Sequence, residues 1–313
     1  MVVPGAPTPD PPLDLGLIRD EPMSRHTYIR LGGPAAFFAM PDSFDSLLQI
    51  AGWARDAGLP LRVVGGGSNL LVADAGVRAV VVSLRRAAGT INVEGDEVHA
   101  GAAVMLPALA RVAAERSLGG LEFAVGIPGT VGGALQTNAG VGDGRCIGDL
   151  VQSVEVLRGA DRVTLPRDGI EFGYRTTSLR GSGEVLLAAR LTLTPRPRAE
   201  VEAEMRRLLE ARQRTQPTAE PNAGSMFRNP PGDAAGRLIE AAGCKGLRSG
   251  GAQVSGLHAN FITADASATA ADVCTLMSEV RRRVHEMAGV TLVPEVEWWG
   301  DGELPAAFLV SGN

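Results

Sequence analysis

The chain has 313 residues, of which 45% are hydrophobic and 21% charged, and its formal net charge is −5. This composition is typical of a globular protein with two or three domains and excludes a disordered chain. The negative balance offers no attraction to nucleic acid or to an anionic membrane surface, and no apolar run approaches the roughly 20 residues of a membrane helix. We therefore expect no nucleic-acid partner and no membrane association.

The first 24 residues are rich in proline and lack a basic stretch followed by an apolar one. We expect a proline-rich tail there and not a secretory signal. Cys146, Cys244 and Cys274 are odd in number and widely spaced, which argues against a disulfide framework or a zinc site and fits a reducing compartment. The four histidines show no metal-ligand spacing. The sequence thus predicts a cytoplasmic protein without a bound metal.

From about residue 25, strands and helices alternate. Residues 43–58 predict an amphipathic helix, because Ser43 is a good cap, apolar residues recur at helical spacing and Gly58 ends the pattern. A strand that enters a glycine-rich loop and a short buried strand follow. We expect residues 25–84 to form a first βαβ-like unit.

A second unit is predicted over residues 85–197. It contains two strands around a turn at Gly95 and Asp96, a helix over 106–118, and strands over 152–158, 161–166 and 184–195. The last third differs, since helices over 199–215 and 269–289 flank strands over 258–264 and 290–300. We expect a separate α+β domain over 198–302, followed by a C-terminal tail over 303–313.

Two glycine-rich segments are candidate ligand sites. "VVGGGSNLLV" (63–72) follows a strand, and consecutive glycines can expose backbone N–H groups to a pyrophosphate, although a tight connection between strands explains the segment equally well. "GIPGTVGGALQTNAG" (126–140) runs into a helix whose amide end could face an anionic ligand; the alternative is a loop that fills space between sheets. Two such segments in neighbouring units favour one extended nucleotide-type ligand.

Other polar motifs are ambiguous when taken singly. Ser225 lies in the Gly-flanked loop "NAGSMFRNP", where neighbouring Met and Phe indicate a hydroxyl in a partly dry place. Arg175 in "GYRTTS" could bind a carboxylate or be a solvated surface residue. Glu295 in "LVPEVEWWG" fits the exposed face of an edge strand, where proline is tolerated. His258 fits a hydrogen-bonded structural residue beside a strand.

These motifs occur in one order: "YIRLGGPA", "VVGGGSNLLV", "LEFAVGIPGTVGGALQTNAG", "YRTTS", "NAGSMFRNP", "GGAQVSGLHANFI" and "LVPEVEWWG". Together they resemble the UDP-N-acetylenolpyruvoylglucosamine reductase family, flavoenzymes of peptidoglycan synthesis that serve cell-wall biogenesis and hence cell shape, cell cycle and cell division. The resemblance implies an α+β fold: a two-subdomain FAD-binding domain of the vanillyl-alcohol-oxidase (PCMH) type and a C-terminal α+β substrate-binding domain. The chain resembles the shorter branch, which lacks a tyrosine-bearing insertion.

The resemblance also implies the chemistry. An NADPH-dependent oxidoreductase with non-covalent FAD would reduce UDP-N-acetylglucosamine-enolpyruvate to UDP-N-acetylmuramate, with hydride passing through flavin N5. Ser225 matches the family's proton donor, Arg175 the group that holds the substrate carboxylate, and Glu295 a second donor to that carboxylate, which requires a raised pKa. We expect the enzyme to be a monomer.

Binding residues are implied by the same motifs. The matching cofactor-binding positions are Val64, Gly65, Gly66, Gly67, Ser68, Asn69, Leu70, Gly126, Ile127, Pro128, Gly129, Thr130, Gly132, Gly133, Ala134, Asn138, Ala139 and Gly140. The matching substrate-binding positions are Tyr174, Arg228, Asn229, Lys245, Gln253, His258 and Asn260. Arg228 and Leu257 stand where the family commonly has lysine, and Thr177 where serine is usual. These departures leave open whether Arg228 and Lys245 contact the diphosphate.

Two alternatives stay open. One is another FAD oxidoreductase of the same superfamily, which would have no need of Ser225, Arg175 and Glu295 together. The other is a catalytically silent flavin- or nucleotide-sugar-binding protein. All three matching positions are intact, which favours the enzyme.

Overall fold

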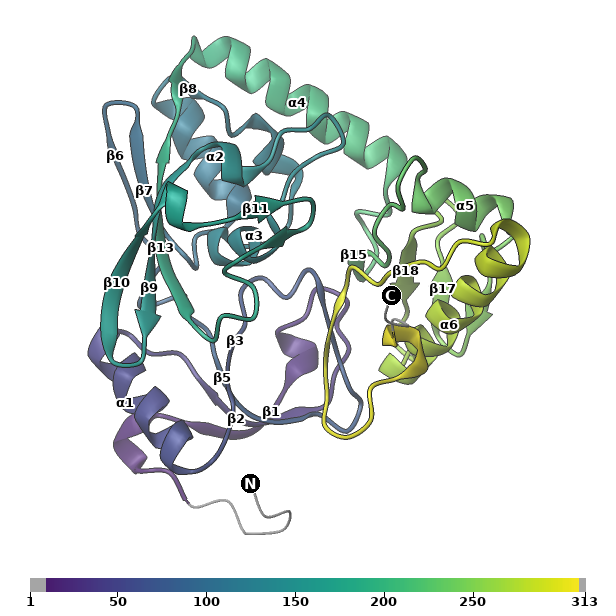
Figure 1. Cartoon of the computed structure of the whole chain (residues 1–313), viewed down its shortest axis with the longest axis horizontal. Coiled ribbons are helices and arrows are strands. Elements are labelled where there is room, and N and C mark those ends of the chain that lie inside the picture. Colours follow the sequence, from purple (N-terminus) through teal and green to yellow (C-terminus); the bar gives the residue numbers. More distant parts are fainter. Residues whose placement is uncertain (1–9, 310–313) are drawn as a thin grey trace. The chain divides into compact units, whose positions relative to one another are not determined.

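The computed structural model describes residues 10–309, so the parts of the predicted tails at 1–9 and 310–313 lie outside the described residues. The described chain forms two compact units, each built from separate stretches of sequence. Unit 1 comprises residues 10–18, 38–66 and 80–211, and unit 2 comprises residues 19–37, 67–79 and 212–309. Figure 1 labels their elements along the chain.

The structure contains α-helices, short 3-10 helices and strands. The helices are α1 (Phe44–Asp56), α2 (Leu106–Glu115), α3 (Val131–Thr137), α4 (Arg198–Thr215), α5 (Ala235–Ala241) and α6 (Ala270–Ala288). The 3-10 helices are η1 (Leu13–Leu15), η2 (Met23–Arg25), η3 (Glu122–Gly126), η4 (Ile147–Asp149), η5 (Arg167–Gly169) and η6 (Ala306–Phe308). None of the helices among residues 10–309 combines the length and the apolar composition that a membrane crossing requires.

The strands form three larger sheets and three pairs. The four-stranded sheet has the order β1 (Ile18–Pro22), β2 (Pro34–Ala39), β5 (Val77–Val82), β3 (Leu61–Val63). The five-stranded sheet has the order β10 (Asp161–Pro166), β9 (Val151–Arg158), β13 (Val185–Thr192), β7 (Glu97–Gly101), β6 (Ile91–Glu94). The second four-stranded sheet has the order β15 (Asn222–Ser225), β18 (Phe261–Ala264), β17 (Ala252–Val254), β16 (Arg248–Ser249). The pairs are β11 (Phe172–Gly173) with β12 (Thr176–Thr177), β14 (Thr194–Pro195) with β8 (Leu118–Gly119), and β19 (Glu297–Trp299) with β4 (Leu70–Val72).

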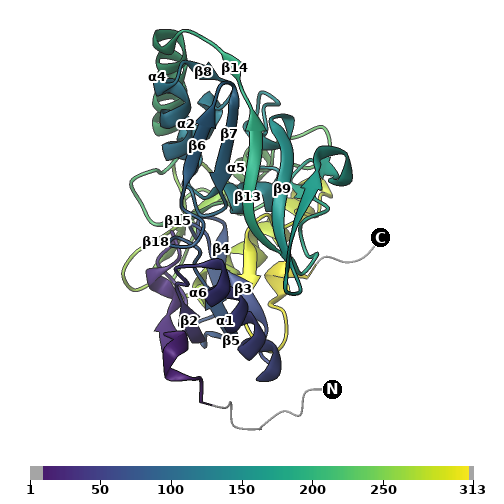
Figure 2. The same cartoon turned by 90° about the vertical axis from the view of Figure 1, so that its left-hand side faces the viewer.

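The five-stranded sheet is the framework of unit 1. Its neighbouring strands are all antiparallel, and Figure 2 shows β6, β7, β13 and β9 side by side. Apolar residues alternate along these strands and pack against α2 and α3, which lie on one face of the sheet in Figure 1. Val98, Leu109, Leu135 and Val154 are fully buried in this core, and each such side chain stabilises the fold by about 1.5–3 kcal/mol.

Helix α1 forms as its sequence predicts. Ser43 is the N-cap, its side chain accepts a hydrogen bond from the N–H of Ser46 at 3.2 Å, and Gly58 adopts a left-handed φ of 65° just beyond the helix. In the adjoining sheet β3 runs parallel to β5, and β5 is almost entirely buried. The predicted buried strand is thus confirmed.

Unit 2 is built around the sheet β15-β18-β17-β16 and helix α6. Helix α6 contacts β16 and β17 and begins with a capping box between Thr269 and Asp272, and it ends at Gly289 with a left-handed φ of 68°. Its predicted extent is therefore confirmed. The parallel pair of β4 and β19 joins residues more than 200 positions apart, with Leu71 opposite Trp298.

The observed units and the domain boundaries predicted from the sequence differ in three respects. The predicted tail over 1–24 contains β1, which belongs to a sheet, and the predicted tail over 303–313 contains η6, whose Ala307 and Phe308 are 1% and 8% exposed. The predicted units over 25–84, 85–197 and 198–302 are each continuous, whereas the two observed units interleave along the chain. Pairings such as β4 with β19 cause this, and periodicity within a short window cannot reveal them.

Candidate active site

The two glycine-rich segments contact each other within unit 1. A Cβ placed on Gly65 would lie 2.4 Å from Thr130 Oγ1, and a Cβ on Gly66 would lie 3.0 Å from Gly129 Cα. Such distances leave little room for a side chain: Gly65 packs against the Thr130 side chain and Gly66 against the Gly129 backbone, so both glycines allow the two loops to approach closely. Protein packing therefore explains part of the glycine content that the sequence interpretation assigned to a ligand.

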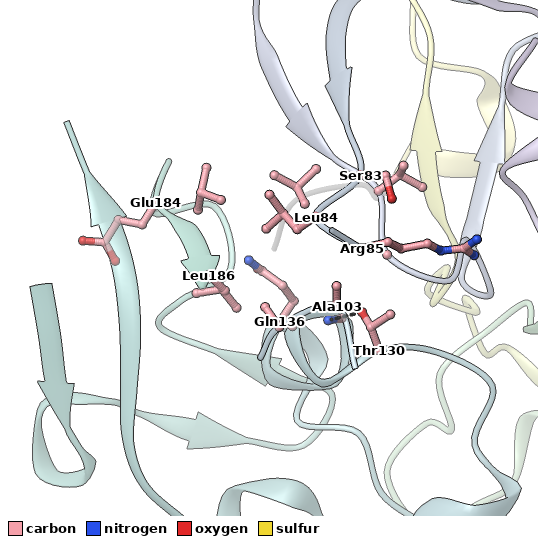
Figure 3. Close-up of a pocket in the computed structure, with 15 residues that line it drawn as sticks. Ser83, Leu84, Arg85, Ala103, Thr130, Gln136, Glu184 and Leu186 are labelled. Atoms are coloured by element: carbon pink, nitrogen blue, oxygen red, sulfur yellow. Dashed lines mark hydrogen bonds between the residues drawn. The ribbon is translucent and has the colours of Figure 1, made fainter. Parts of the chain in front are cut away.

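A pocket opens beside this contact. Its lining comes from both loops, from the segment after β5, from the segment after β7 and from the start of β13: Val63, Val64, Gly65, Ser83, Leu84, Arg85, Ala102, Ala103, Thr130, Gly132, Gly133, Gln136, Glu184, Val185 and Leu186. Figure 3 shows the Gln136 side chain reaching toward Leu84, while the Arg85 guanidinium and the Glu184 carboxylate point away from the centre. The Glu184 carboxylate pairs with Arg158 at 2.6 Å.

Gly133 differs from the other glycines of this pocket. It is exposed, and a Cβ placed on it would meet only Thr130 Oγ1, at 3.6 Å, which is ordinary van der Waals contact. Gly132, by contrast, approaches Ala102 so closely that a Cβ would lie 3.1 Å from the Ala102 Cβ. Packing thus accounts for Gly132 but not for Gly133, which presents bare backbone to the pocket.

The pocket fits a part of a dinucleotide cofactor. The buried side chains of Val64, Leu84 and Leu186 give apolar walls that suit a flat ring, and the Ser83 hydroxyl and the Gln136 amide can accept and donate hydrogen bonds. Because Gly133 has no side chain, a ligand can approach its backbone in the pocket, and any larger residue at this position would occupy part of that space. No group of three or more His, Cys, Asp or Glu side chains that could hold a metal ion occurs among residues 10–309.

Arg175 lies in the hairpin of β11 and β12, also in unit 1. Its φ is 55°, a left-handed conformation that costs energy for a residue with a side chain and is common at functional sites. The Arg175 Nη1 donates to the Gly140 carbonyl at 3.4 Å. Tyr174 beside it is 62% exposed.

Asn138 holds this hairpin against the end of α3. Asn138 Nδ2 donates to the Gly173 carbonyl at 3.0 Å, and Asn138 Oδ1 accepts from the Gly148 N–H at 3.0 Å. Asn138 is the left-handed C-cap of α3, with φ 46°, and Thr177 Oγ1 adds a bond to the Leu135 carbonyl at 3.0 Å. The Asn138 amide thus holds the backbone at Gly173 and at Gly148, and its role as a cofactor residue stays a prediction.

Ser225 lies at the end of β15 in unit 2 and is half-buried. The two residues that follow, Met226 and Phe227, are each 1% exposed and belong to the core of this unit. Their side chains anchor residues 225–228, the serine loop, in the core of unit 2. This explains why a loop carries methionine and phenylalanine. The Gly224 φ of 74° makes the bend before Ser225.

Asn260 holds the same loop through hydrogen bonds, and its side-chain amide pairs with the Phe227 backbone as a neighbouring strand would. The Phe227 N–H donates to Asn260 Oδ1 at 3.0 Å, Asn260 Nδ2 donates to the Phe227 carbonyl at 2.8 Å, and the Met226 N–H donates to the Asn260 carbonyl at 2.8 Å. Asn260 is 3% exposed. Both ends of the Asn260 amide therefore hold the backbone of Phe227, and its predicted contact with the substrate stays a prediction.

Glu295 is held next to this loop from both sides. Its N–H donates to the Met226 carbonyl at 2.8 Å, and its carbonyl accepts from Asn69 Nδ2 at 3.1 Å. The Glu295 side chain is half-buried, on a segment where Phe227 and Pro294 form an isolated bridge. Ser225 and Glu295 are thus brought into one neighbourhood of unit 2, which local sequence alone did not indicate for Glu295.

The other predicted substrate contacts have varied surroundings. The Arg228 N–H donates to the Val293 carbonyl at 2.9 Å, and its buried Nε finds no hydrogen-bond acceptor among the described residues. Lys245 pairs with Glu240 at 2.8 Å on the surface. Gln253 Nε2 donates to the Gly246 carbonyl at 3.4 Å, and Asn229 Oδ1 accepts from the first N–H of α5 at 2.9 Å. In this group, the buried Arg228 Nε is the atom that lacks a hydrogen-bond acceptor among the described residues.

His258 has a structural environment. Its Nδ1 accepts from the Asn260 N–H at 3.2 Å, its ring lies edge-on to Phe261 at 4.9 Å, and burial lowers its pKa. A neutral ring that accepts from the backbone matches the hydrogen-bonded residue that local sequence favoured.

The remaining predicted cofactor residues fall in both units. Ala134 and Ala139 are buried in the core of unit 1, so their side chains are not available to a ligand, while Gly126, Ile127, Pro128 and Gly140 are half-buried. Gly67, Ser68, Asn69 and Leu70 belong to unit 2, where Gly67 has a left-handed φ of 62° and Leu70 starts the buried strand β4.

Sequence reasoning missed several lining residues of the pocket. Ser83, Leu84 and Arg85 directly follow the buried strand β5, and Glu184 precedes β13. Their position at strand ends is the signal that could have indicated them, because ligand-binding residues commonly follow the strands of a rigid scaffold.

The comparisons with known proteins define the class first. A family model for an FAD-binding domain matches residues 35–164, which include both glycine-rich segments and most of the pocket lining. The chain is therefore a flavoprotein with an FAD-binding domain. A model for the C-terminal domain of UDP-N-acetylenolpyruvoylglucosamine reductase matches residues 216–299, which include Ser225 and Glu295.

Whole-chain relatives then define the family. UDP-N-acetylenolpyruvoylglucosamine reductase from Moorella thermoacetica is 48% identical over 291 residues, which cover 93% of this chain and 95% of the relative. The protein of the same name from Geobacter metallireducens is 43% identical over 91% of this chain and 94% of its own length. The crystal structure of that reductase from Thermus caldophilus superimposes with a TM-score of 0.78 at 36% identity, over 91% of this chain and 98% of that one. The chain belongs to the UDP-N-acetylenolpyruvoylglucosamine reductase family.

Family membership confirms the resemblance deduced from the motifs. It also confirms the α+β fold class, with an FAD-binding domain followed by a family-specific C-terminal domain. The individual roles assigned to side chains remain predictions.

Proposed function

We propose that this chain reduces UDP-N-acetylglucosamine-enolpyruvate to UDP-N-acetylmuramate with NADPH, as a cytoplasmic monomer in the synthesis of peptidoglycan precursors and hence in cell-wall growth and division. The observation that carries the proposal is similarity at 48% identity over nearly the whole chain to a protein named for this reductase. The reaction would add hydride to the methylene carbon of the enolpyruvyl group and a proton to the adjacent carbon. FAD, when bound, supplies the redox chemistry, since it can take hydride from NADPH and pass it to the substrate.

FAD would be held by unit 1 and its loops. The apolar walls around Leu84 and Leu186 would bind a flat ring of the cofactor, and the exposed backbone at Gly133 would allow close approach. The Gln136 amide would give a directional hydrogen bond in the same pocket. These contacts would fix the cofactor without any covalent bond.

Ser225 would deliver the proton. A serine hydroxyl is a weak acid, so it must be held within hydrogen-bond reach of the carbon that becomes basic, in a place shielded from water. Buried Met226 and Phe227 fix the loop, and the Asn260 amide holds its backbone, which supports such preorganisation. The proton lost by the hydroxyl would be replaced from solvent after the product leaves.

Arg175 and Glu295 would act on the substrate carboxylate. The planar Arg175 guanidinium would bind the carboxylate and stabilise the negative charge that develops on the enolate oxygens. Glu295, in its protonated form, would donate a hydrogen bond to the same group. Arg228, whose buried Nε has no acceptor among residues 10–309, would bind an anionic part of the substrate such as the diphosphate.

Two half-reactions of the purified protein test the proposal. Under anaerobic conditions NADPH should bleach the oxidised flavin band, and addition of UDP-N-acetylglucosamine-enolpyruvate should restore it. Ser225→Ala should bleach normally and recover roughly 10²- to 10⁴-fold more slowly, the range for loss of a general acid. Ser267→Ala, at an exposed serine of the same unit, is the matched control and should recover like the wild type.

Each failure has a distinct meaning. A wild-type protein that bleaches but never recovers with this substrate would assign the chain to a different flavin oxidoreductase. A protein that binds flavin but does not bleach would point to a silent flavin-binding protein. Equal slowing of both half-reactions in Ser225→Ala would remove the proton-donor assignment.

A further inference from the structure

Residues 305–309 form a docked segment at the end of unit 2, which we name the C-terminal segment. It contains η6, and Ala307 and Phe308 are 1% and 8% exposed within the core of the unit. The Phe308 ring lies against the Trp298 ring, with centroids 5.5 Å apart and planes tilted by 38°. The family model of the C-terminal domain ends at residue 299, before this segment.

One arginine of α6 joins the C-terminal segment to the extended stretch that precedes Glu295. Arg281 Nη1 and Nη2 donate to the carbonyls of Ala306, Ala307 and Leu309 at 2.9, 3.1 and 2.8 Å. Arg281 Nε donates to the Leu292 carbonyl at 3.0 Å. A planar guanidinium with several donors can satisfy four carbonyls in a way that a lysine ammonium cannot.

These contacts bracket the segment that carries Glu295. The Leu292 carbonyl lies three residues before Glu295, and Trp298 lies three residues after it. Between them the backbone pairs with the serine loop: the Val293 carbonyl accepts from Arg228, and the Glu295 N–H donates to Met226. Arg281 and the C-terminal segment therefore contact the two ends of residues 292–298, and the loop after Ser225 pairs with the backbone between them.

We propose that the C-terminal segment and Arg281 are positioning elements for Glu295 and, through the paired backbone, for Ser225. This inference rests on the proposed function, because only that function gives Glu295 and Ser225 catalytic roles. The pocket described for the cofactor is lined only by residues of unit 1. Loss of the C-terminal segment should therefore slow the step that uses substrate and spare flavin binding and reduction.

The experiment compares two truncations of the full chain. One ends at Leu304 and removes the C-terminal segment; the control ends at Leu309 and keeps every contact given above. A displacement of about 1 Å at a reacting group can cost roughly 10²-fold in rate, so we expect recovery of the flavin band by substrate to slow by roughly 10- to 100-fold in the shorter chain. The bleaching rate with NADPH and the FAD content should match the control.

A point-variant pair keeps the test decisive if the shorter chain does not fold. Arg281→Ala removes all four hydrogen bonds, and Arg281→Lys keeps the charge and can reach fewer carbonyls. At saturating substrate we expect the flavin band to recover fastest in the wild type, more slowly in Arg281→Lys and most slowly in Arg281→Ala. The rate of bleaching by NADPH should be the same in all three. A merely structural role would lower thermal stability and FAD content and would slow both half-reactions together.

The outcomes separate this inference from the proposed function. If the wild type recovers with substrate and both the chain ending at Leu304 and Arg281→Ala recover at the same rate, the positioning role is refuted while the function stands. If both half-reactions fall in parallel, the segment only stabilises the fold and the inference is refuted as well. If the wild type itself never recovers, the proposed function fails, and the inference falls with it.

Discussion

The bare backbone of Gly133 allows a test in which stability and cofactor binding change in opposite directions. Gly133 is the third residue of α3, its φ is not positive, and a Cβ would make only one ordinary contact with the protein. Glycine lowers helix stability by up to about 1 kcal/mol relative to alanine. Gly133→Ala should therefore leave the apoprotein equally stable or raise its Tm by up to about 2–4 °C.

FAD binding should respond in the opposite sense. If Gly133 faces the cofactor, an added methyl group overfills the contact and makes the free energy of FAD binding less favourable by about 1–3 kcal/mol. The Kd for FAD should then rise by about 5- to 150-fold. Gly52→Ala is the matched control, because Gly52 lies within α1 and a Cβ there would meet nothing within 4 Å. It should stabilise the apoprotein and leave the FAD Kd unchanged.

Titration of the apoproteins with FAD, followed by flavin fluorescence, gives the Kd values, and thermal unfolding of the same samples gives the Tm values. An unchanged Kd in Gly133→Ala would refute the assignment of this residue to the cofactor pocket. A lower Tm for the apoprotein would show that packing requires the glycine after all.

The other predictions concern positioning and charge. Asn138→Gly tolerates the left-handed backbone but loses two hydrogen bonds of about 1 kcal/mol each, so stopped-flow spectra should show normal bleaching by NADPH and slower recovery with substrate. Asn138→Ala loses the same hydrogen bonds and strains the left-handed backbone, so its Tm should fall below that of Asn138→Gly. Asn260→Asp replaces the donor to the Phe227 carbonyl with a buried charge and should lower the free energy of unfolding in urea by about 1–3 kcal/mol at least. Hydrogen bonds from Arg207 hold the pKa of Glu204 at about 2, below its ordinary 4.5, so the unfolded chain takes up the proton first and stability falls as pH falls from about 4.5 toward 2. Glu204→Gln should flatten that fall in urea titrations across this pH range; an unchanged slope would contradict the assignment.

Local signals predicted much of the secondary structure. The helix after Ser43 and the helix between Thr269 and Gly289 begin and end where a capping side chain and a left-handed glycine stand next to an amphipathic pattern. The hairpin around Gly95 was visible for the same reason, since its turn residue adopts a left-handed φ of 64°. Such features act over a few residues, and a single sequence carries them in full.

Long-range pairing was not predictable in this way. Nothing in "LLV" at residues 70–72 specifies a partner at residues 297–299, and the buried pair follows only once the surrounding core has formed. The short strand β1 has exposed residues and no alternation, so its sequence resembles a tail. The interleaved units could therefore not be deduced from patterns in short windows.

In the candidate site, too, some features follow from local sequence and others depend on long-range pairing. The glycines of both loops were found from the sequence, yet Gly65 and Gly66 are required by loop–loop packing, which only the fold reveals. Glu295 resembled a surface residue, because its hydrogen bond to the Met226 carbonyl joins it to a loop more than 60 residues away in sequence. Family resemblance supplied what local chemistry could not.

The parallel pair of β4 and β19 has a consequence for how the chain is made. Residues 70–72 emerge from a ribosome long before their partners at 297–299, and at about 5–20 residues per second the delay is roughly 10–45 s. During that interval the apolar sequence "LLV" has no strand to pair with, and the first two stretches of unit 2 wait for the third. The pair can thus form only after residue 299 has been synthesised, and nascent chains that stop before Trp299 should expose this stretch to proteases and to chaperones that bind unpaired apolar segments.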